Sequence, residues 1–250
     1  QGKIGSAPTL DLWAGFDKAA NKLLAPAHEV IPKPYQQFYN AAGVFENDGI
    51  SIAEAIKNAK LEAPYSDMVD GLVGVFAHNY NNQVGIMDIY RFFALSNFSF
   101  EELNNTTTRY KMDGGTVKLI NAMVEEAKPK VKLGAVVMNI AQNEDGVSIT
   151  TEDEEIFTAS AAVVTVPMNV LKDIEFDPKL DNLKLSASNE THGGSGIKFH
   201  VLLKGNYGSI SCLAPNKEAL NLLMTEKSYE NETHMLGFGP SSDALDVNDT

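Results

Sequence analysis

Several features that mark common protein classes are scarce or missing in this 250-residue sequence, which has one cysteine, Cys212, and one tryptophan. A single cysteine excludes an intrachain disulfide and a cysteine-rich metal site. The five histidines show no metal-ligand spacing, so we expect no bound metal. No run reaches the roughly 18 apolar residues of a membrane helix, and the first residues, QGKIGSAP, do not resemble a signal peptide. We therefore expect a soluble chain without a membrane segment, which favours an intracellular location but does not identify the compartment.

Basic residues are also in short supply, since 20 lysines and arginines stand against 33 aspartates and glutamates, for a net charge of −13. Nucleic acids and anionic membranes attract clustered Lys and Arg, so this balance argues against both as partners. An acidic surface would steer a cationic small molecule, such as an amine, toward the protein. The plainer alternative is that the charge only keeps the chain soluble.

The glycine-rich phosphate-binding motifs, G-x-G-x-x-G and the P-loop, are missing as well, so nothing here cradles a phosphate by itself. The first part of the chain shows helical periodicity instead. Apolar residues fall at helical spacing over residues 10–24, and Ser51-Ile52-Ala53-Glu54 is a capping box that predicts a helix to about residue 60. Two further helices are expected over residues 65–80 and 86–94.

The middle of the chain changes to strand patterns after Asp113-Gly114-Gly115 and an apolar helical stripe over residues 117–128. Alternating runs at 131–140 and 147–151 flank an Asp-Gly turn, which predicts a hairpin, and a third strand is expected at 156–157. Residues 162–166 form an uncharged, β-branched run typical of a strand buried on both faces, and Pro167 ends it. This run is either a plain core strand or one that delivers backbone to a site.

A lysine lies in the middle of the strand expected at residues 196–203. By the period-two rule Lys198, His200, Leu202 and Lys204 share one face of this strand, and the residues between them share the other. Such a lysine is normally solvated, so the pattern alone does not assign it a function. Further strands are expected at 207–213 and 234–238, with a helix or loop at 217–222 between them.

Four of these features occur in an order that resembles the middle of a flavin-dependent amine oxidase of the monoamine/polyamine oxidase family. They are Gly114-Gly115, Val136-Val137, the run Thr165-Val166-Pro167-Met168-Asn169-Val170-Leu171, and Lys198. The resemblance covers most of residues 75–240 and implies an α+β fold with FAD as cofactor. It implies a mostly helical part of the substrate domain at 1–112, a partial FAD-binding domain at 113–170, and substrate-domain sheet strands and helices at 171–250.

The same resemblance implies roles for individual residues. Lys198 would hold a water molecule against N5 of the flavin, where a compact cation stabilises negative charge developing on flavin and oxygen. The backbone of Val137, or of Val136, would meet the adenine. The turn at Gly114 and Gly115 and the residue Pro167 would lie on the flavin side. Phe92, Phe93 and Thr108 would shape the substrate cavity, although aromatic pairs more commonly belong to a core.

The function that follows is oxidation of a primary or secondary amine to an imine, with O2 reduced to H2O2. Amino acid, polyamine and protoporphyrinogen oxidation would fit the same scaffold. Because intact family members begin with a phosphate-binding turn and end with another flavin-binding segment, the sequence is interpreted as an internal piece that alone is inactive and does not retain FAD. The alternative is a non-catalytic binding or interaction domain that keeps the scaffold without a cofactor. The oligomeric state is not indicated.

Overall fold

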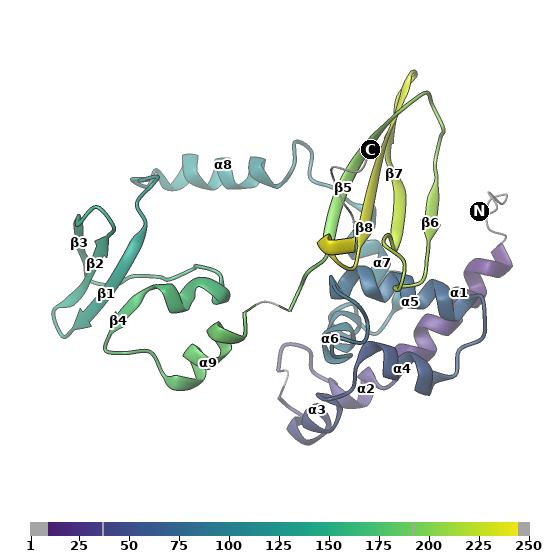
Figure 1. Cartoon of the computed structure of the whole chain (residues 1–250), viewed down its shortest axis with the longest axis horizontal. Coiled ribbons are helices and arrows are strands. Elements are labelled where there is room, and N and C mark those ends of the chain that lie inside the picture. The colour runs from purple at the N-terminus through teal and green to yellow at the C-terminus, as the bar shows by residue number, and fades with distance from the viewer. Residues whose placement is uncertain (1–9, 37, 192, 245–250) are drawn as a thin grey trace. The chain divides into compact units, whose positions relative to one another are not determined.

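The computed structural model describes residues 10–36, 38–191 and 193–244, and the chain divides into two compact units (Figure 1). The larger unit comprises Gln1–Lys111 and Gly194–Thr250, and the smaller unit comprises Met112–Gly193. Both combine helices with a small antiparallel or mixed sheet, which makes the fold α+β as expected. Within the described ranges, no helix is long and apolar enough to cross a membrane.

The first half of the larger unit is helical, as its sequence predicts. The helix expected at 10–24 is confirmed with both ends, and it buries Phe16, Leu23 and Leu24. The capping box is confirmed too, because the Ser51 hydroxyl accepts a hydrogen bond from the Glu54 N–H at 3.1 Å. The helices are α1 (Leu10–Leu24), α2 (Ala27–Val30), α3 (Ala41–Asn47), α4 (Ile52–Ala59), α5 (Tyr65–Ala77), α6 (Met87–Leu95), α7 (Phe100–Asn104) and a π-helical turn, η1 (Asn105–Arg109).

A single apolar cluster holds these helices together. α1 lies at its centre and contacts α4, α5, α6 and α7. Among the fully buried side chains are Ile52, Ile86 and Ile89, which come from α4 and from the start of α6. Burying side chains of this size contributes about 1.5–3 kcal/mol each, so this cluster is the main source of stability in the helical half.

The second half of the larger unit is an antiparallel sheet in the order β5-β8-β7-β6, against which α5 packs. Two of its strands follow the sequence prediction closely. The strand expected at 207–213 begins only at Ser211, and residues 217–222 contain no helix. The strands are β5 (Ile197–Lys204), β6 (Ser211–Leu213), β7 (Leu222–Ser228) and β8 (Glu232–Gly239), followed by a short 3-10 turn, η3 (Ser242–Ala244).

A buried polar network joins α5 to the sheet. The Asp70 carboxylate accepts hydrogen bonds from the Asn216 backbone N–H at 2.7 Å and from the Asn81 side-chain amide at 2.8 Å. The Asn216 side chain in turn accepts from the Asn81 backbone N–H at 2.5 Å. Breaking one such bond would leave a buried polar group unpaired, at a cost of about 1–3 kcal/mol. The network therefore fixes the helical half against the sheet.

The smaller unit contains a mixed sheet in the order β3-β2-β1-β4. The predicted hairpin is confirmed at its turn, since Asn143 pairs with Gly146 and β1 and β2 run antiparallel from there. Its first strand was expected from residue 131 but begins only at Val137. The parallel edge strand β4 and the helix after it have no counterpart in the sequence-based expectations. The elements are α8 (Thr116–Ala127), β1 (Val137–Asn143), β2 (Gly146–Thr151), β3 (Ile156–Ala159), η2 (Met168–Asp173), β4 (Glu175–Asp177) and α9 (Asn182–Glu190).

The prediction of a buried strand at 162–166 was wrong. These residues form no strand in the structure, and Val163 is 88% exposed and Val164 41% exposed. An apolar β-branched run becomes a strand only when a neighbouring strand offers it a hydrogen-bond ladder. Within the described part of the smaller unit, β4 occupies the open edge of β1 instead.

The expected division at residue 170 falls inside the smaller unit. β4 pairs with β1, and α9 packs on η2, where the Ser188 hydroxyl donates to the Met168 carbonyl at 2.6 Å and accepts from the Lys172 N–H at 2.9 Å. The compact unit consequently runs on to Gly193.

Candidate functional site

Lys198 is the second residue of β5, and its backbone pairs with Phe238 of β8. Its side chain is exposed, and the ammonium nitrogen lies 5.5 Å from the centre of the Phe238 ring. At that distance the ring face attracts the cation. The lysine is thus held at the start of the strand by sheet pairing and by an aromatic ring, with its charge accessible to water.

The start of β5 is fixed by His78, the residue that ends α5 in a left-handed conformation with φ of 51°. Its carbonyl oxygen accepts hydrogen bonds from the backbone N–H groups of both Ser195, at 2.8 Å, and Gly196, at 2.7 Å. A Cβ atom at position 196 would fall 3.0 Å from the His78 Cα and 3.1 Å from the Gly239 carbonyl. A glycine is therefore required two residues before Lys198, and sequence reasoning did not find His78 as its support.

The alternation predicted for this strand is visible over its first half. Lys198 and His200 are exposed, whereas Ile197 and Phe199 are half-buried. The Phe199 ring lies over Gly237, its partner on β8, so closely that a Cβ on that glycine would overlap the ring. The glycine makes room for the ring, and the ring keeps Phe199 on the face opposite to Lys198.

The two adjacent phenylalanines of α6 point to different surroundings, as their spacing predicts. Phe93 is 2% exposed and lies edge-on to Phe98 and His28, so it belongs to the core. Phe92 is 42% exposed and lies against Phe76 of α5, with ring centres 5.9 Å apart. Of this pair, Phe92 is the side chain available to a ligand.

The neighbouring Tyr90 of α6 is buried, and this burial raises the pKa of its hydroxyl above the ordinary value of 10.0. The physical cause is desolvation, which disfavours the charged phenolate.

Thr108 lies in η1, but its side chain falls outside the described residues. The threonines before it explain the irregular turn. The Thr106 and Thr107 hydroxyls both donate to the Leu103 carbonyl, at 3.1 and 2.7 Å, and such back-bonding competes with the regular helical pattern. The candidate cavity residue Thr108 therefore stands in a backbone stretch of unusual geometry.

The turn at Gly114 and Gly115 has the conformation that only glycine adopts readily, with φ of 77° and 76°. Gly115 precedes the first residue of α8, and no side chain caps this helix start. A Cβ on Gly115 would meet nothing within 4 Å, so the space beside it is open. The uncapped N–H groups of the first turn are donors suited to an anion or a polar ligand atom.

Val137 is the first residue of β1, and Val136 immediately precedes it. The Val136 carbonyl accepts from the Glu152 N–H at 2.8 Å, whereas the pairing of β1 with β4 begins only at Asn139. Successive residues of a strand direct their backbone polar groups to opposite sides. The backbone N–H and C=O of Val137 therefore point away from β2, at a place where β4 does not yet pair with β1.

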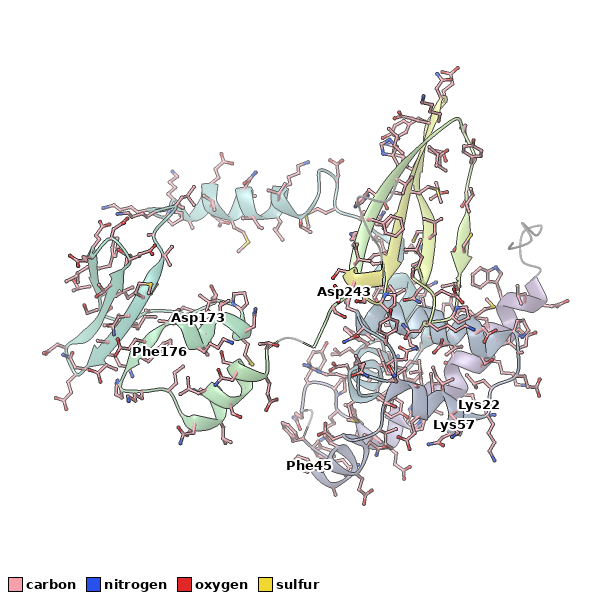
Figure 2. The ribbon with its side chains drawn as sticks, viewed as in Figure 1. Lys22, Phe45, Lys57, Asp173, Phe176 and Asp243 are labelled. Atoms are coloured by element: carbon pink, nitrogen blue, oxygen red, sulfur yellow. The ribbon has the colours of Figure 1, made fainter. Side chains whose placement is uncertain are left out.

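Pro167 precedes η2, between two exposed side chains, Val166 and Met168, that line an open apolar groove of about 690 Å³. A second hollow of about 510 Å³ shares Val164 and Phe176 with this groove. Asp173 and Phe176 are labelled in this part of the smaller unit in Figure 2.

The sequence-predicted residues thus fall into two sets. Lys198, Phe92 and Phe93 belong to the larger unit, and the glycines, valines and proline belong to the smaller. Among the described residues, no three His, Cys, Asp or Glu side chains gather in a way that would hold a metal ion.

Residues 28–234 match the family described as flavin containing amine oxidoreductase. The chain is 31% identical to pseudooxynicotine dehydrogenase from a Pseudomonas species, over 99% of this chain and 50% of that protein. It is 29% identical to nicotine dehydrogenase of Pseudomonas putida (strain DSM 28022 / S16), over 92% of this chain and 48% of that protein.

A solved structure of putrescine oxidase, the wild type bound to putrescine, superposes with a TM-score of 0.73 at 16% identity, covering 98% of this chain and 55% of that one. At that identity the likeness shows the fold alone. The chain spans about half the length of the curated relatives it matches. With the family match extending over most of its residues, the chain belongs to the flavin-containing amine oxidoreductases.

Proposed function

We propose that the protein oxidises a primary or secondary amine to an imine, with FAD as cofactor and O2 reduced to H2O2, and that this activity needs the parts of its relatives that the present chain does not span. The observation that carries the proposal is the family match over residues 28–234. The relatives support an amine as substrate class, because two of them are named for pseudooxynicotine and nicotine. The net charge of −13 would favour the approach of a cationic amine.

The residues of the smaller unit fit a bound dinucleotide. The Gly114-Gly115 turn offers open space beside uncapped N–H donors, and the free edge of Val137 offers backbone groups to a flat polar ring. Val166, Pro167 and Met168 border an apolar groove suited to an aromatic ring system. When bound, FAD would accept a hydride equivalent from the α-carbon of the amine and pass the electrons to O2.

Lys198 is the residue of this chain that we assign to the chemical step. Its ammonium would donate a hydrogen bond to a water molecule and stabilise negative charge that develops nearby. Its exposed side chain, held only over the Phe238 ring, leaves the three N–H donors of Nζ available for this role.

In the larger unit, we assign the cavity wall to Phe92, which presents accessible ring surface, and to Thr108, whereas Phe93 belongs to the core. Phe93 would contribute indirectly, because its packing in the core fixes the position of α6.

The test is stopped-flow kinetics on the full-length protein carrying Lys198→Met, which keeps the length of the side chain and removes its charge. Lys204→Met, on the same face of β5, is the matched control. We expect flavin reduction or reoxidation to slow by about 10²-fold in the first variant, as when one stabilising donor is removed, and to stay unchanged in the control. Equal rates for both variants would remove Lys198 from the mechanism.

The retention of flavin is tested separately with the 250-residue chain. We expect this chain alone to bind no FAD and to show no amine oxidation. A yellow preparation with stoichiometric flavin would contradict that expectation. A full-length protein without flavin would favour a non-catalytic binding domain.

A further inference from the structure

A hollow of about 370 Å³ in the larger unit is unusually basic for so acidic a protein. It lies between the α1 helix and the segment that follows α4, and its charged lining consists of three lysines and one glutamate. The residues around it are Gly15, Lys18, Ala19, Lys22, Lys60, Leu61, Glu62 and Tyr65. The whole sequence, in contrast, carries a net charge of −13.

The lysines are concentrated here by the geometry of two helices. Lys18 and Lys22 are one turn apart on α1 and therefore share a face, together with Gly15 and Ala19. Lys60 follows α4 and lines the hollow, and Lys57 lies in the last turn of that helix without lining the hollow itself. Figure 2 labels Lys22 and Lys57 at the same edge of the larger unit.

None of these four lysines forms an ion pair with the described acidic side chains, because every salt bridge in the described ranges involves other residues. Like charges at i and i+4 on a helix destabilise it by about 0.2–0.5 kcal/mol. A nearby carboxylate would relieve this repulsion, and acidic residues are plentiful in the chain. Among the described residues no carboxylate lies within ion-pair distance of these lysines, and with Glu62 included the lining of the hollow still has an excess of positive charge.

One lysine is held in place at the hollow. The Lys22 ammonium donates to the Lys60 carbonyl at 3.3 Å, which restricts its side chain and satisfies an acceptor at the end of α4. The Tyr65 ring lies directly on Gly15, with both its ring carbons and its hydroxyl close to that residue. A Cβ there would fall 2.2 Å from the ring carbon Cζ. Ala19, at 8% exposure, and Leu61 complete the apolar surface.

We infer that this hollow binds a small organic anion, namely a carboxylate attached to a compact apolar body. The ammonium groups of Lys18 and Lys22 contact the carboxylate, and Tyr65 and Leu61 contact the apolar body. The volume is that of a small-ligand pocket. This site lies outside the residues assigned to amine oxidation, and its occupancy does not depend on flavin.

The experiment is a titration of the 250-residue chain, isotopically labelled and free of flavin, with sodium benzoate, followed by amide chemical shifts. Benzyl alcohol serves as a neutral probe of the same shape, and inorganic phosphate serves as an anion without an apolar body. We expect benzoate to shift the amides of Gly15, Ala19 and Leu61, and to bind more tightly than either of the other two probes.

Two variants make the test specific. Lys18→Gln keeps the bond between Lys22 and Lys60, so it preserves the end of α4, and the double variant Lys18→Gln with Lys22→Gln removes both contacts. From the usual worth of exposed ion pairs, we expect the double variant to weaken benzoate binding about fivefold or more and Lys18→Gln to weaken it about twofold to fivefold. Lys130→Gln with Lys179→Gln, two exposed lysines of the smaller unit, makes the same charge change and should leave the affinity unaltered.

The proposal is overturned if benzyl alcohol or phosphate binds as tightly as benzoate, or if the shifts map to other residues. Equal weakening by the control pair would likewise overturn it, since a general charge effect would then explain the binding. Because no step of the titration involves flavin or an amine, failure here leaves the proposed oxidase function untouched.

Discussion

Gly196 approaches His78 so closely that a Cβ atom at position 196 would lie 3.0 Å from the His78 Cα. The two residues come from opposite sides of the smaller unit in the sequence, and their contact sets where β5 begins. Lys198 follows two residues later, so the location of the candidate catalytic ammonium depends on a backbone contact rather than on its own side chain.

Replacing Gly196 by alanine should therefore destabilise the larger unit. The added methyl group must displace backbone of His78 or Gly239, and overpacking of this kind costs about 1–3 kcal/mol. The measurement is the free energy of unfolding in urea. Gly49→Ala is the control, because a Cβ there meets nothing within 4 Å, and it should change stability by much less. Equal effects of the two variants would show that the close approach to His78 does not matter.

The two phenylalanines of α6 should respond differently to truncation. Phe93→Ala removes a ring that is 2% exposed and should cost about 3–5 kcal/mol. Phe92→Ala removes a ring that is 42% exposed, with one aromatic contact, and should cost about 1 kcal/mol or less. Thermal unfolding followed by circular dichroism distinguishes the two. A larger loss for Phe92 would reverse the assignment of the core residue.

Asn216 should be among the most sensitive polar positions. Asn216→Ala leaves the buried N–H of Asn81 without its acceptor, at an expected cost of about 1–3 kcal/mol. Asn58→Ala, at an exposed position of α4, provides the comparison and should be nearly neutral or slightly stabilising, because alanine favours helices. The same urea titration reports both. A neutral Asn216→Ala would mean that water replaces the lost bond without penalty.

Burial of Tyr90 makes a prediction about alkaline pH. Its pKa is raised in the folded protein above the ordinary value of 10.0, so the unfolded chain loses this proton first as the pH rises. The free energy of unfolding should fall as the pH passes 10 and continues toward the folded-state pKa, and Tyr90 should have no such effect at lower pH.

Tyr90→Phe should flatten this part of the pH profile, whereas Tyr35→Phe, at a side chain 89% exposed, should leave it as in the parent protein. Titration followed by the absorbance of tyrosinate detects directly the hydroxyl whose pKa is raised. Profiles that are parallel for all three proteins would exclude Tyr90 as the cause.

Elements that depend on residues close together in the chain were predicted better than elements that need a distant partner. The helix at 10–24 and the hairpin turn at Asn143 were predicted correctly because both depend on spacing and turn chemistry within a few residues. The run at 162–166 was mispredicted because a strand needs a partner from elsewhere in the chain. The helix α9 was not foreseen, although Asp181 is a recognisable cap whose carboxylate accepts from the Leu183 N–H at 2.8 Å.

For the candidate site, the sequence predicted that Lys198 and His200 share one face of their strand, and both are exposed in the structure. It did not predict that His78 anchors this strand. The anchor uses a backbone carbonyl, which every residue possesses, so no residue type marks it. Its only trace is a glycine at position 196, which many other causes would also explain.

The bond between the Asp70 carboxylate and the Asn216 N–H joins residues that are 146 positions apart, with the entire smaller unit between them. During synthesis on a ribosome, the helices of the first half would lack their contact with the sheet while the smaller unit is being synthesised. Folding should then conclude in one late step, once the segment around Asn216 becomes accessible. A nascent chain halted before that point would expose the face of α5 that the sheet later covers, and surface exposed in this way is prone to aggregation.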